Sequence, residues 1–216
     1  MPVSVERRAA IGSFVFAVLF TVPLIIAGKL PTNEESDAEI LPYFTHTKWQ
    51  IAAFSGAILV AAAGLLFVWL LAYLYQRLRA SSSEGAVLPV VVLLNGLLFV
   101  AMLFVGSAVF AFIPVLAWGN SIPDPGVEIA RIVPQLGMIV FFFFGSLAAS
   151  AFVATLSWGV SRTRILPLWL ARCGYVASFI LIFGVILVPT LALTIWMILL
   201  SIALARSPGS TETAVS

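Results

Sequence analysis

The sequence is poor in charged residues. Of its 216 residues, 9 are acidic and 11 are Lys or Arg, so 9% of the chain is charged while 62% is hydrophobic. An ordinary soluble domain has about 25% charged and about 45–50% apolar residues. So few charges cannot coat the surface of a soluble protein of this size, whereas a lipid bilayer removes that requirement. The composition therefore excludes a water-soluble fold and predicts that the lipid bilayer surrounds most of the chain and is its main partner.

Residues that bind metals are almost absent. The chain has one cysteine, Cys173, and one histidine, His46, which excludes an internal disulfide and a metal site with the usual Cys/His spacing. The basic residues lie at the ends of apolar segments and form no continuous patch, so a nucleic-acid partner is not expected. We therefore expect no metal, no other cofactor and no DNA or RNA partner.

The apolar segments themselves lack ionisable side chains. They contain no Asp, Glu, Lys or His, and Arg172 sits near a segment end, where it can extend to the membrane interface. Proton relays, ion-coupled transport and intramembrane acid–base catalysis need such residues. The sequence therefore predicts that the protein is not an enzyme.

Six apolar segments are present, at residues 9–28, 49–75, 87–114, 134–157, 167–186 and 189–205. Each of the first four is long enough for the roughly 20 helical residues that cross about 30 Å of hydrocarbon. The stretch from Leu168 to Ala205 is about twice the length of one crossing, and Pro189 predicts a tight turn that divides it into two helices. A re-entrant pair that never reaches the far side is the alternative.

The positive charges predict the orientation. With six crossings and a cytoplasmic N-terminus, three basic residues (Lys29, Lys48, Arg131) lie outside and eight lie in the cytoplasm: Arg7, Arg8, Arg77, Arg79, Arg162, Arg164, Arg172 and Arg206. This asymmetry follows the positive-inside rule. Both termini are therefore predicted to be cytoplasmic.

The expected fold class is an all-α membrane protein, a six-transmembrane-helix bundle with short cytoplasmic loops and two larger external loops. Residues 1–206 form its single domain, and residues 29–48 and 115–133 form the external loops. Residues 207–216, which are small and polar, are expected to be a disordered cytoplasmic tail.

A few polar residues inside or beside the apolar segments are the candidate sites. Asn95 lies well inside the third segment, at a depth where it could meet Ser150 or Ser178. Gln135 lies beside Pro134 at the outer end of the fourth segment. A polar solute site is one interpretation of these residues; interhelical hydrogen bonds for Asn95 and an interfacial contact for Gln135 are the preferred ones.

Four stretches resemble a group of uncharacterised six-helix membrane proteins common in actinobacteria: GKLPTNEESDAEILPYFTHTKWQ, LLFVWLLAYLYQRLR, IPDPGVEIARIVPQLG and RILPLWLARCGYVASFILIF. The likeness covers most of the chain, although Cys173 and Tyr175 stand where such proteins often have Trp-Leu-Gly-x-x-Gly. The resemblance implies the six-helix topology and a bacterial plasma membrane. The group has no assigned activity, so no functional residue is carried over from it.

The leading functional prediction is a non-enzymatic plasma-membrane protein that acts as an accessory or interaction subunit or supports the cell envelope. Its partner would be a second copy of the chain or another membrane protein. The alternative is a small transporter or channel for an uncharged or zwitterionic solute, with a path lined by Asn95, Gln135 and helix Ser and Thr residues. A lipid-modifying enzyme is the third interpretation, and its acids would have to come from the first external loop.

Overall fold

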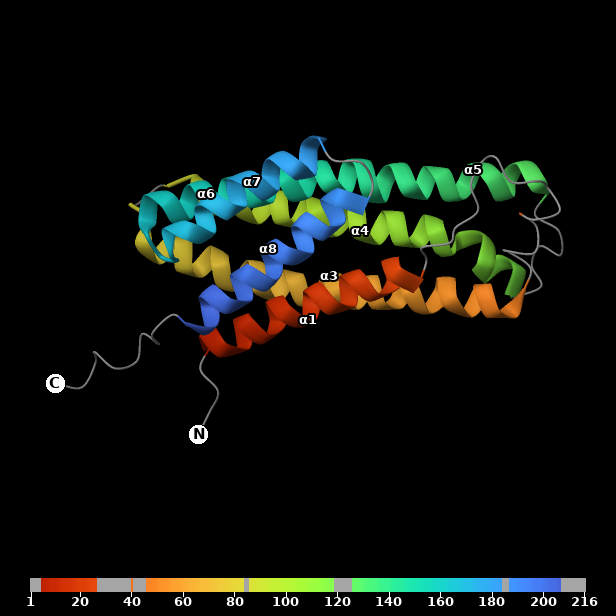
Figure 1. The fold of residues 1–216 in the computed structure, drawn as a ribbon, viewed down its shortest axis with the longest axis horizontal. Coiled ribbons are helices and arrows are strands. Elements are labelled where there is room, and N and C mark those ends of the chain that lie inside the picture. Colours follow the sequence, from red (N-terminus) through yellow and green to blue (C-terminus); the bar gives the residue numbers. More distant parts are fainter. Residues whose placement is uncertain are drawn as a thin grey trace.

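The computed structural model describes residues 5–26, 40, 46–83, 86–118, 126–183 and 187–206. Within these ranges the chain is helical apart from short turns, and the described residues contain no strand. The helices are α1 (Val5–Ile26), α3 (Thr47–Ser81), α4 (Leu88–Trp118), α5 (Val127–Met138), η1 (Ile139–Phe144), α6 (Gly145–Thr163), α7 (Leu168–Phe183) and α8 (Leu187–Ala205). They form an elongated bundle (Figure 1). The all-helical prediction is confirmed for these residues.

Four helices are long and apolar enough to cross a membrane: Thr47–Ser81, Leu88–Leu116, Val127–Thr163 and Val188–Ala205. Leu168–Phe183 is also apolar but shorter. The first helix begins with three charged residues, Glu6, Arg7 and Arg8, ahead of its apolar part. The described residues thus carry the helices that a membrane protein requires.

The helix of the fourth apolar segment begins earlier than the sequence predicts. It starts at Val127 rather than at Pro134, and α5, η1 and α6 continue as one helix of 37 residues. Pro134 is accommodated inside α5. The middle of the helix, η1, is π-helical, and the Gly145 N–H donates to the carbonyl of Val140, five residues back.

The division between the last two helices also lies earlier than predicted. The sequence predicts a turn at Pro189, whereas α7 ends at Phe183 and Pro189 lies in the first turn of α8. A proline is tolerated there because the first N–H groups of a helix have no intrahelical acceptor. The prediction of two helices in this stretch is confirmed, and the position of the turn is corrected.

The six helical segments close into a ring. Each packs against the next along the chain, in the order α1, α3, α4, α5–η1–α6, α7 and α8, and α8 packs back against α1. Three hydrogen bonds join these terminal helices. Ser13 Oγ donates to the Met197 carbonyl at 2.8 Å, Ser201 Oγ donates to the Ala10 carbonyl at 2.7 Å, and the hydroxyls of Thr21 and Thr194 lie 2.9 Å apart. Such bonds favour helix association in a bilayer, where lipid gives little hydrophobic drive.

The helices differ in length. α3 has 35 residues and α4 has 31, which correspond to about 52 and 46 Å, whereas α7 has 16, or about 24 Å. Figure 1 shows α1, α7 and α8 beside only part of the length of α3, α4 and α5–α6, toward the end where the chain termini lie. The ends of the long helices that lie away from the chain termini therefore project beyond the three short ones.

Aromatic rings fill the centre of the bundle. The Phe67 ring lies 4.9 Å from the Phe16 ring, 5.4 Å from the Phe99 ring and 5.1 Å from the Phe152 ring, measured between centroids. Trp196 continues this cluster, 6.0 Å from Phe152. The three edge-to-face pairs among them, Phe67 with Phe99, Phe67 with Phe152 and Phe152 with Trp196, each contribute about 0.5–1.5 kcal/mol beyond the area they bury.

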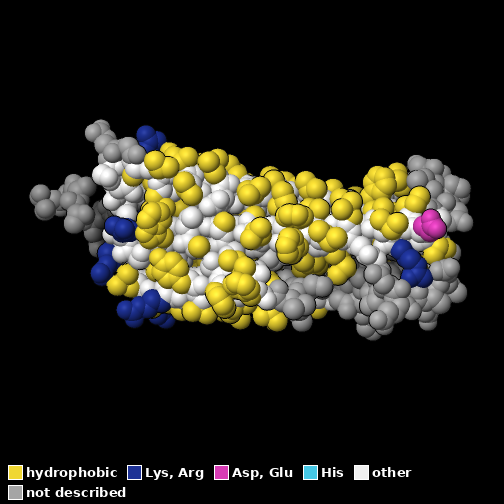
Figure 2. All heavy atoms as spheres, turned by 90° about the horizontal axis from the view of Figure 1, so that it is seen from above, with side chains coloured by type: hydrophobic (Ala, Val, Ile, Leu, Met, Phe, Trp, Pro, Cys, Tyr) yellow, Lys and Arg dark blue, Asp and Glu magenta, His cyan; other side chains and the backbone are white. Residues whose placement is uncertain are grey.

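The surface is divided along the long axis. On the face drawn in Figure 2, hydrophobic side chains lie along the middle of the molecule, and the Lys, Arg, Asp and Glu side chains that are visible lie near its two ends. Several of the largest apolar side chains are strongly exposed, including Trp69 at 80%, Phe143 at 65% and Phe179 at 64%. The predicted tail at 207–216, most of the first predicted external loop (29–48) and residues 119–125 of the second lie outside the described residues. The rest of the second predicted loop (115–133) is not a loop, because apart from Gly126 it belongs to α4 and α5.

Candidate functional site

Asn95 makes an interhelical contact, though not to the residues that its depth suggests. Its Nδ2 donates to the Ala151 carbonyl at 3.5 Å and to Thr155 Oγ1 at 3.4 Å. Both distances lie beyond the usual range for N–H···O bonds, so each bond is weak. Asn95 is half-buried and joins α4 to α6, and no hydrogen bond links it to Ser150 or Ser178 within the described residues.

Ser150 and Ser178 pair with each other. Their hydroxyls lie 2.9 Å apart, Ser150 Oγ also lies 2.9 Å from the Ser178 carbonyl, and Ser178 Oγ lies 3.2 Å from the Ser150 carbonyl. Both residues are buried, at 2% and 7% exposure. Their polar atoms are therefore used in joining α6 to α7.

Gln135 is separate from the other three candidates. It is half-buried on α5, and 15 residues of continuous helix place it about 22 Å along the axis from Ser150. Gln135 does have a partner in the structure. The fold thus pairs Ser150 with Ser178 but does not bring the four predicted residues into one site.

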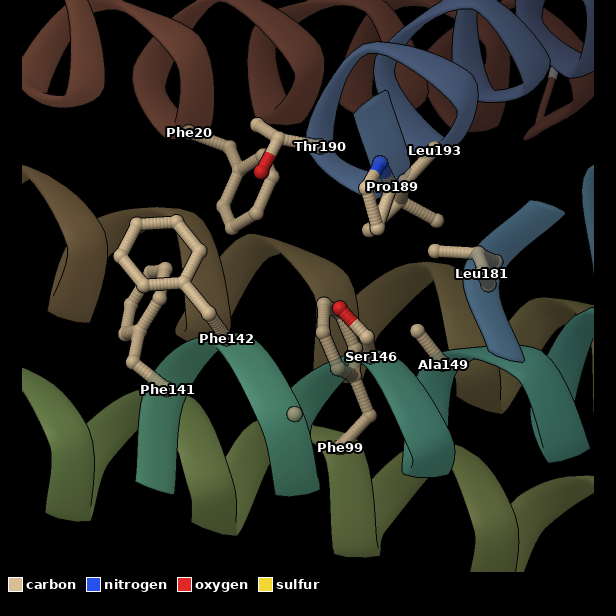
Figure 3. Close-up of a pocket in the computed structure, with 11 residues that line it drawn as sticks. Phe20, Phe99, Phe141, Phe142, Ser146, Ala149, Leu181, Pro189, Thr190 and Leu193 are labelled. Carbon is tan, nitrogen blue, oxygen red and sulfur yellow. The ribbon is translucent and has the colours of Figure 1, made fainter. Parts of the chain in front are cut away.

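A small pocket lies where α8 begins. Figure 3 shows four phenylalanines around it, Phe20, Phe99, Phe141 and Phe142, together with Ser146 and Thr190. Its water-accessible volume is about 10 Å³, which is room for about one water molecule. Asn95, Gln135, Ser150 and Ser178 do not line it. The pocket is too small for an organic solute without movement of its walls.

Sequence reasoning missed a close contact among α6, α7 and α8. At Gly174 a β-carbon would collide with Ser157 Oγ and would lie 2.9 Å from Trp196 Nε1. These two polar atoms are buried and have no hydrogen-bond partner. Glycine at 174 therefore lets α7 approach α6 and α8 closely, and the two polar atoms at this point form no hydrogen bond that would explain the approach. Small residues are a sequence signal for close helix packing, but they do not identify which pairs meet.

The described residues offer little for acid–base or metal chemistry. They contain no group of three or more His, Cys, Asp or Glu side chains that could hold a metal ion. Their two acidic residues, Glu6 and Glu128, begin different helices at opposite ends of the bundle. The buried and half-buried polar side chains are mainly hydroxyls and amides, which at neutral pH suit hydrogen bonding better than proton transfer.

Comparison with known proteins gives no relative: no family model, curated protein or solved structure matches the chain.

Proposed function

We propose that the protein is a multi-pass plasma-membrane protein with six crossings and cytoplasmic termini, and that it is a non-enzymatic accessory or interaction subunit. A role in supporting the envelope belongs to the same class. Membership of the actinobacterial six-helix group is part of this proposal. The arginine-rich end of the bundle would face the cytoplasm.

The observation that carries the interaction role is an exposed apolar stripe on α5. Ile129, Ile132 and Leu136 are 52%, 65% and 52% exposed, and they lie three and four residues apart on one helix face. This helix belongs to the part of the bundle that projects beyond α1, α7 and α8 (Figure 1). If the short helices match the hydrocarbon thickness, the stripe stands at or beyond the headgroups, where lipid tails do not cover it.

The helix α5 also has a buried face in the same projecting part of the bundle. Ala130, on another face, is buried against Ile113 of α4 and against Ile40, which belongs to the first predicted external loop. One face of α5 is thus covered by its own chain while the stripe is uncovered. This division supports a surface kept for a partner, either a second copy or another membrane protein.

Site-specific photo-crosslinking in intact cells tests the proposal. A photoreactive amino acid at Ile132 should give a discrete crosslinked protein band, because this position faces the partner. The matched control is Val176, which is 62% exposed but lies on α7, one of the three short helices. A band at Ile132 and none at Val176 supports the proposal. Lipid adducts alone at both positions, with purification of an unaccompanied monomer, would contradict it.

The topology requires a separate test. In a Cys173→Ala background, cysteines at Ser83 and Arg206 should be protected from a membrane-impermeant thiol reagent in intact cells, and a cysteine at Glu128 should react. All three residues are exposed in the structure. External labelling at Arg206 would mean that the termini lie on opposite sides, and six crossings would then be wrong.

A further inference from the structure

The hairpin formed by α6 and α7 carries a concentrated positive charge at the end of the bundle where the chain termini lie. Arg162, Arg164 and Arg172 fall within eleven residues of sequence, and all three are exposed. Figure 2 shows Lys and Arg side chains gathered at this end of the molecule. Three cationic groups on one short hairpin make a local surface of a single sign.

No acidic side chain neutralises this surface among the residues that the structure describes. Arg162, Arg164 and Arg172 form no ion pair there, and Glu6 on α1 is the one described acidic residue at this end. Glu6 has an interaction partner of its own in the structure. Within the described part of the chain, the three guanidinium groups of the hairpin therefore have no acidic partner and can contact an anion.

Helix electrostatics explains only part of this arrangement. Arg162 and Arg164 lie at the C-terminus of α6, where the helix dipole favours cations, but Arg172 lies in the second turn of α7, where the dipole gives no such benefit. Arg164 also adopts the left-handed conformation, with φ of 57°, at a cost that glycine would avoid. The backbone at position 164 thus favours glycine, yet the chain has an arginine there.

The surroundings of the arginines suit a membrane interface. The Arg162 guanidinium carbon lies 5.7 Å from the centre of the Trp158 ring, and Ser161 Oγ lies 3.4 Å from the Tyr175 hydroxyl. Trp158, Trp169 and Tyr175 are 48%, 40% and 45% exposed. Tryptophan and tyrosine side chains concentrate at the level of lipid headgroups, with the ring toward the acyl chains and the polar atom toward water.

We propose that this hairpin surface, defined by Arg162, Arg164 and Arg172 with Trp158 and Trp169, binds the headgroup of an anionic glycerophospholipid. The guanidinium groups contact the phosphate oxygens, for which their planar pairs of N–H donors are suited. The two indole rings pack along the glycerol and upper acyl region. The inference rests on the proposed membrane function and adds a ligand class to it.

Competition between lipids in native mass spectrometry tests the site. The full-length protein is purified from mixed micelles with equal amounts of phosphatidylglycerol and phosphatidylcholine, and the retained lipids are counted. The wild type should retain phosphatidylglycerol in excess. Replacing one arginine by glutamine should reduce this excess about fivefold, which corresponds to about 1 kcal/mol per basic residue at a membrane surface.

Charge variants separate the site from general effects. The triple variant Arg162→Gln, Arg164→Gln, Arg172→Gln should lose the preference, whereas Lys48→Gln at the other end of the bundle should keep it. The matching triple lysine variant should keep only part of the preference, because the charge remains but the paired N–H donors of the guanidinium groups are lost. Persistence of the full preference in the glutamine variant, or its loss in Lys48→Gln, would overturn the proposal.

Two further outcomes are decisive. Release of phosphatidylglycerol by millimolar inorganic phosphate would assign the surface to free phosphate and overturn a lipid site. A protein that resists carbonate extraction from membranes and has the expected cysteine topology, but shows no lipid preference, would refute this inference and leave the proposed membrane function standing. A protein released by carbonate would refute the membrane function itself.

Discussion

Gly174 of α7 faces Ser157 of α6 so closely that a β-carbon at position 174 would collide with the serine hydroxyl. Trp196 of α8 lies against the same glycine. Three helices of the ring therefore meet at a residue without a side chain, and their spacing depends on it. In lipid, such close approach replaces the hydrophobic drive that packs helices in water.

The substitution Gly174→Ala should destabilise the protein by about 1–3 kcal/mol, because the added methyl overpacks a buried contact. The free energy of unfolding in mixed micelles with SDS gives the measurement. Gly12→Ala is the matched control, since a β-carbon there meets nothing within 4 Å. It should be neutral or slightly stabilising.

A double-mutant cycle identifies the contact itself. Ser157→Ala removes the atom with which the new methyl collides, so Ser157→Ala with Gly174→Ala should cost less than the sum of the two single changes. Strict additivity would show that Gly174→Ala acts through another contact, such as that with Trp196.

The hydrogen bond between Ser150 and Ser178 is predicted to have a structural role. Ser178→Ala should destabilise the bundle by about 0.6 kcal/mol, the mean for interhelical hydrogen bonds in membranes, because Ser150 Oγ keeps the Ser178 carbonyl as acceptor. Ser55→Ala is the control, since its hydroxyl is exposed and bonds only within α3. A large change in uptake of a neutral solute with unchanged stability would instead support the transporter alternative.

Much of the fold follows from the sequence because the apolar segments are long and the charges lie between them. Each expected segment corresponds to a helix of the structure. Helix ends were harder to predict. Pro134 was expected to begin a segment but lies inside α5, because a proline interrupts only one backbone hydrogen bond and neighbouring packing can compensate. Pro189 was expected to form the turn but lies in the first turn of α8, where its missing N–H has no intrahelical acceptor to lose.

The candidate residues were predicted less well than the helices. Sequence depth placed Asn95 near Ser150 or Ser178, but depth does not give the rotation of a helix about its axis, and Asn95 reaches Thr155 instead. The pairing of Ser13 with Met197 could not be predicted at all, because residues 184 apart are joined only by closure of the ring. Six crossings, their orientation and the partner stay predictions.

Closure of the ring can be tested by crosslinking. The hydroxyls of Thr21 and Thr194 lie 2.9 Å apart, so Thr21→Cys with Thr194→Cys, in a Cys173→Ala background, should form a disulfide in membranes treated with an oxidant. A gel shift after proteolytic cleavage of the chain between the two cysteines detects it. Thr21→Cys with Val176→Cys is the control pair and should stay reduced, since α7 is not a neighbour of α1 in the ring. Efficient crosslinking of the control pair would contradict the helix order.

The last prediction concerns the depth of the connection between α7 and α8. Both helices are short for a full crossing, with 16 and 19 residues, or about 24 and 28 Å, against about 30 Å of hydrocarbon. Val188, 53% exposed in the first turn of α8, should therefore lie at the interface rather than in open water. A Val188→Cys thiol should react with an external impermeant reagent on the order of tenfold more slowly than a Glu128→Cys thiol, because an apolar setting that raises a thiol pKa by about one unit lowers its thiolate fraction tenfold. Equal rates would place the connection in water, and complete protection would favour the re-entrant pair, so this one comparison decides whether α7 and α8 cross.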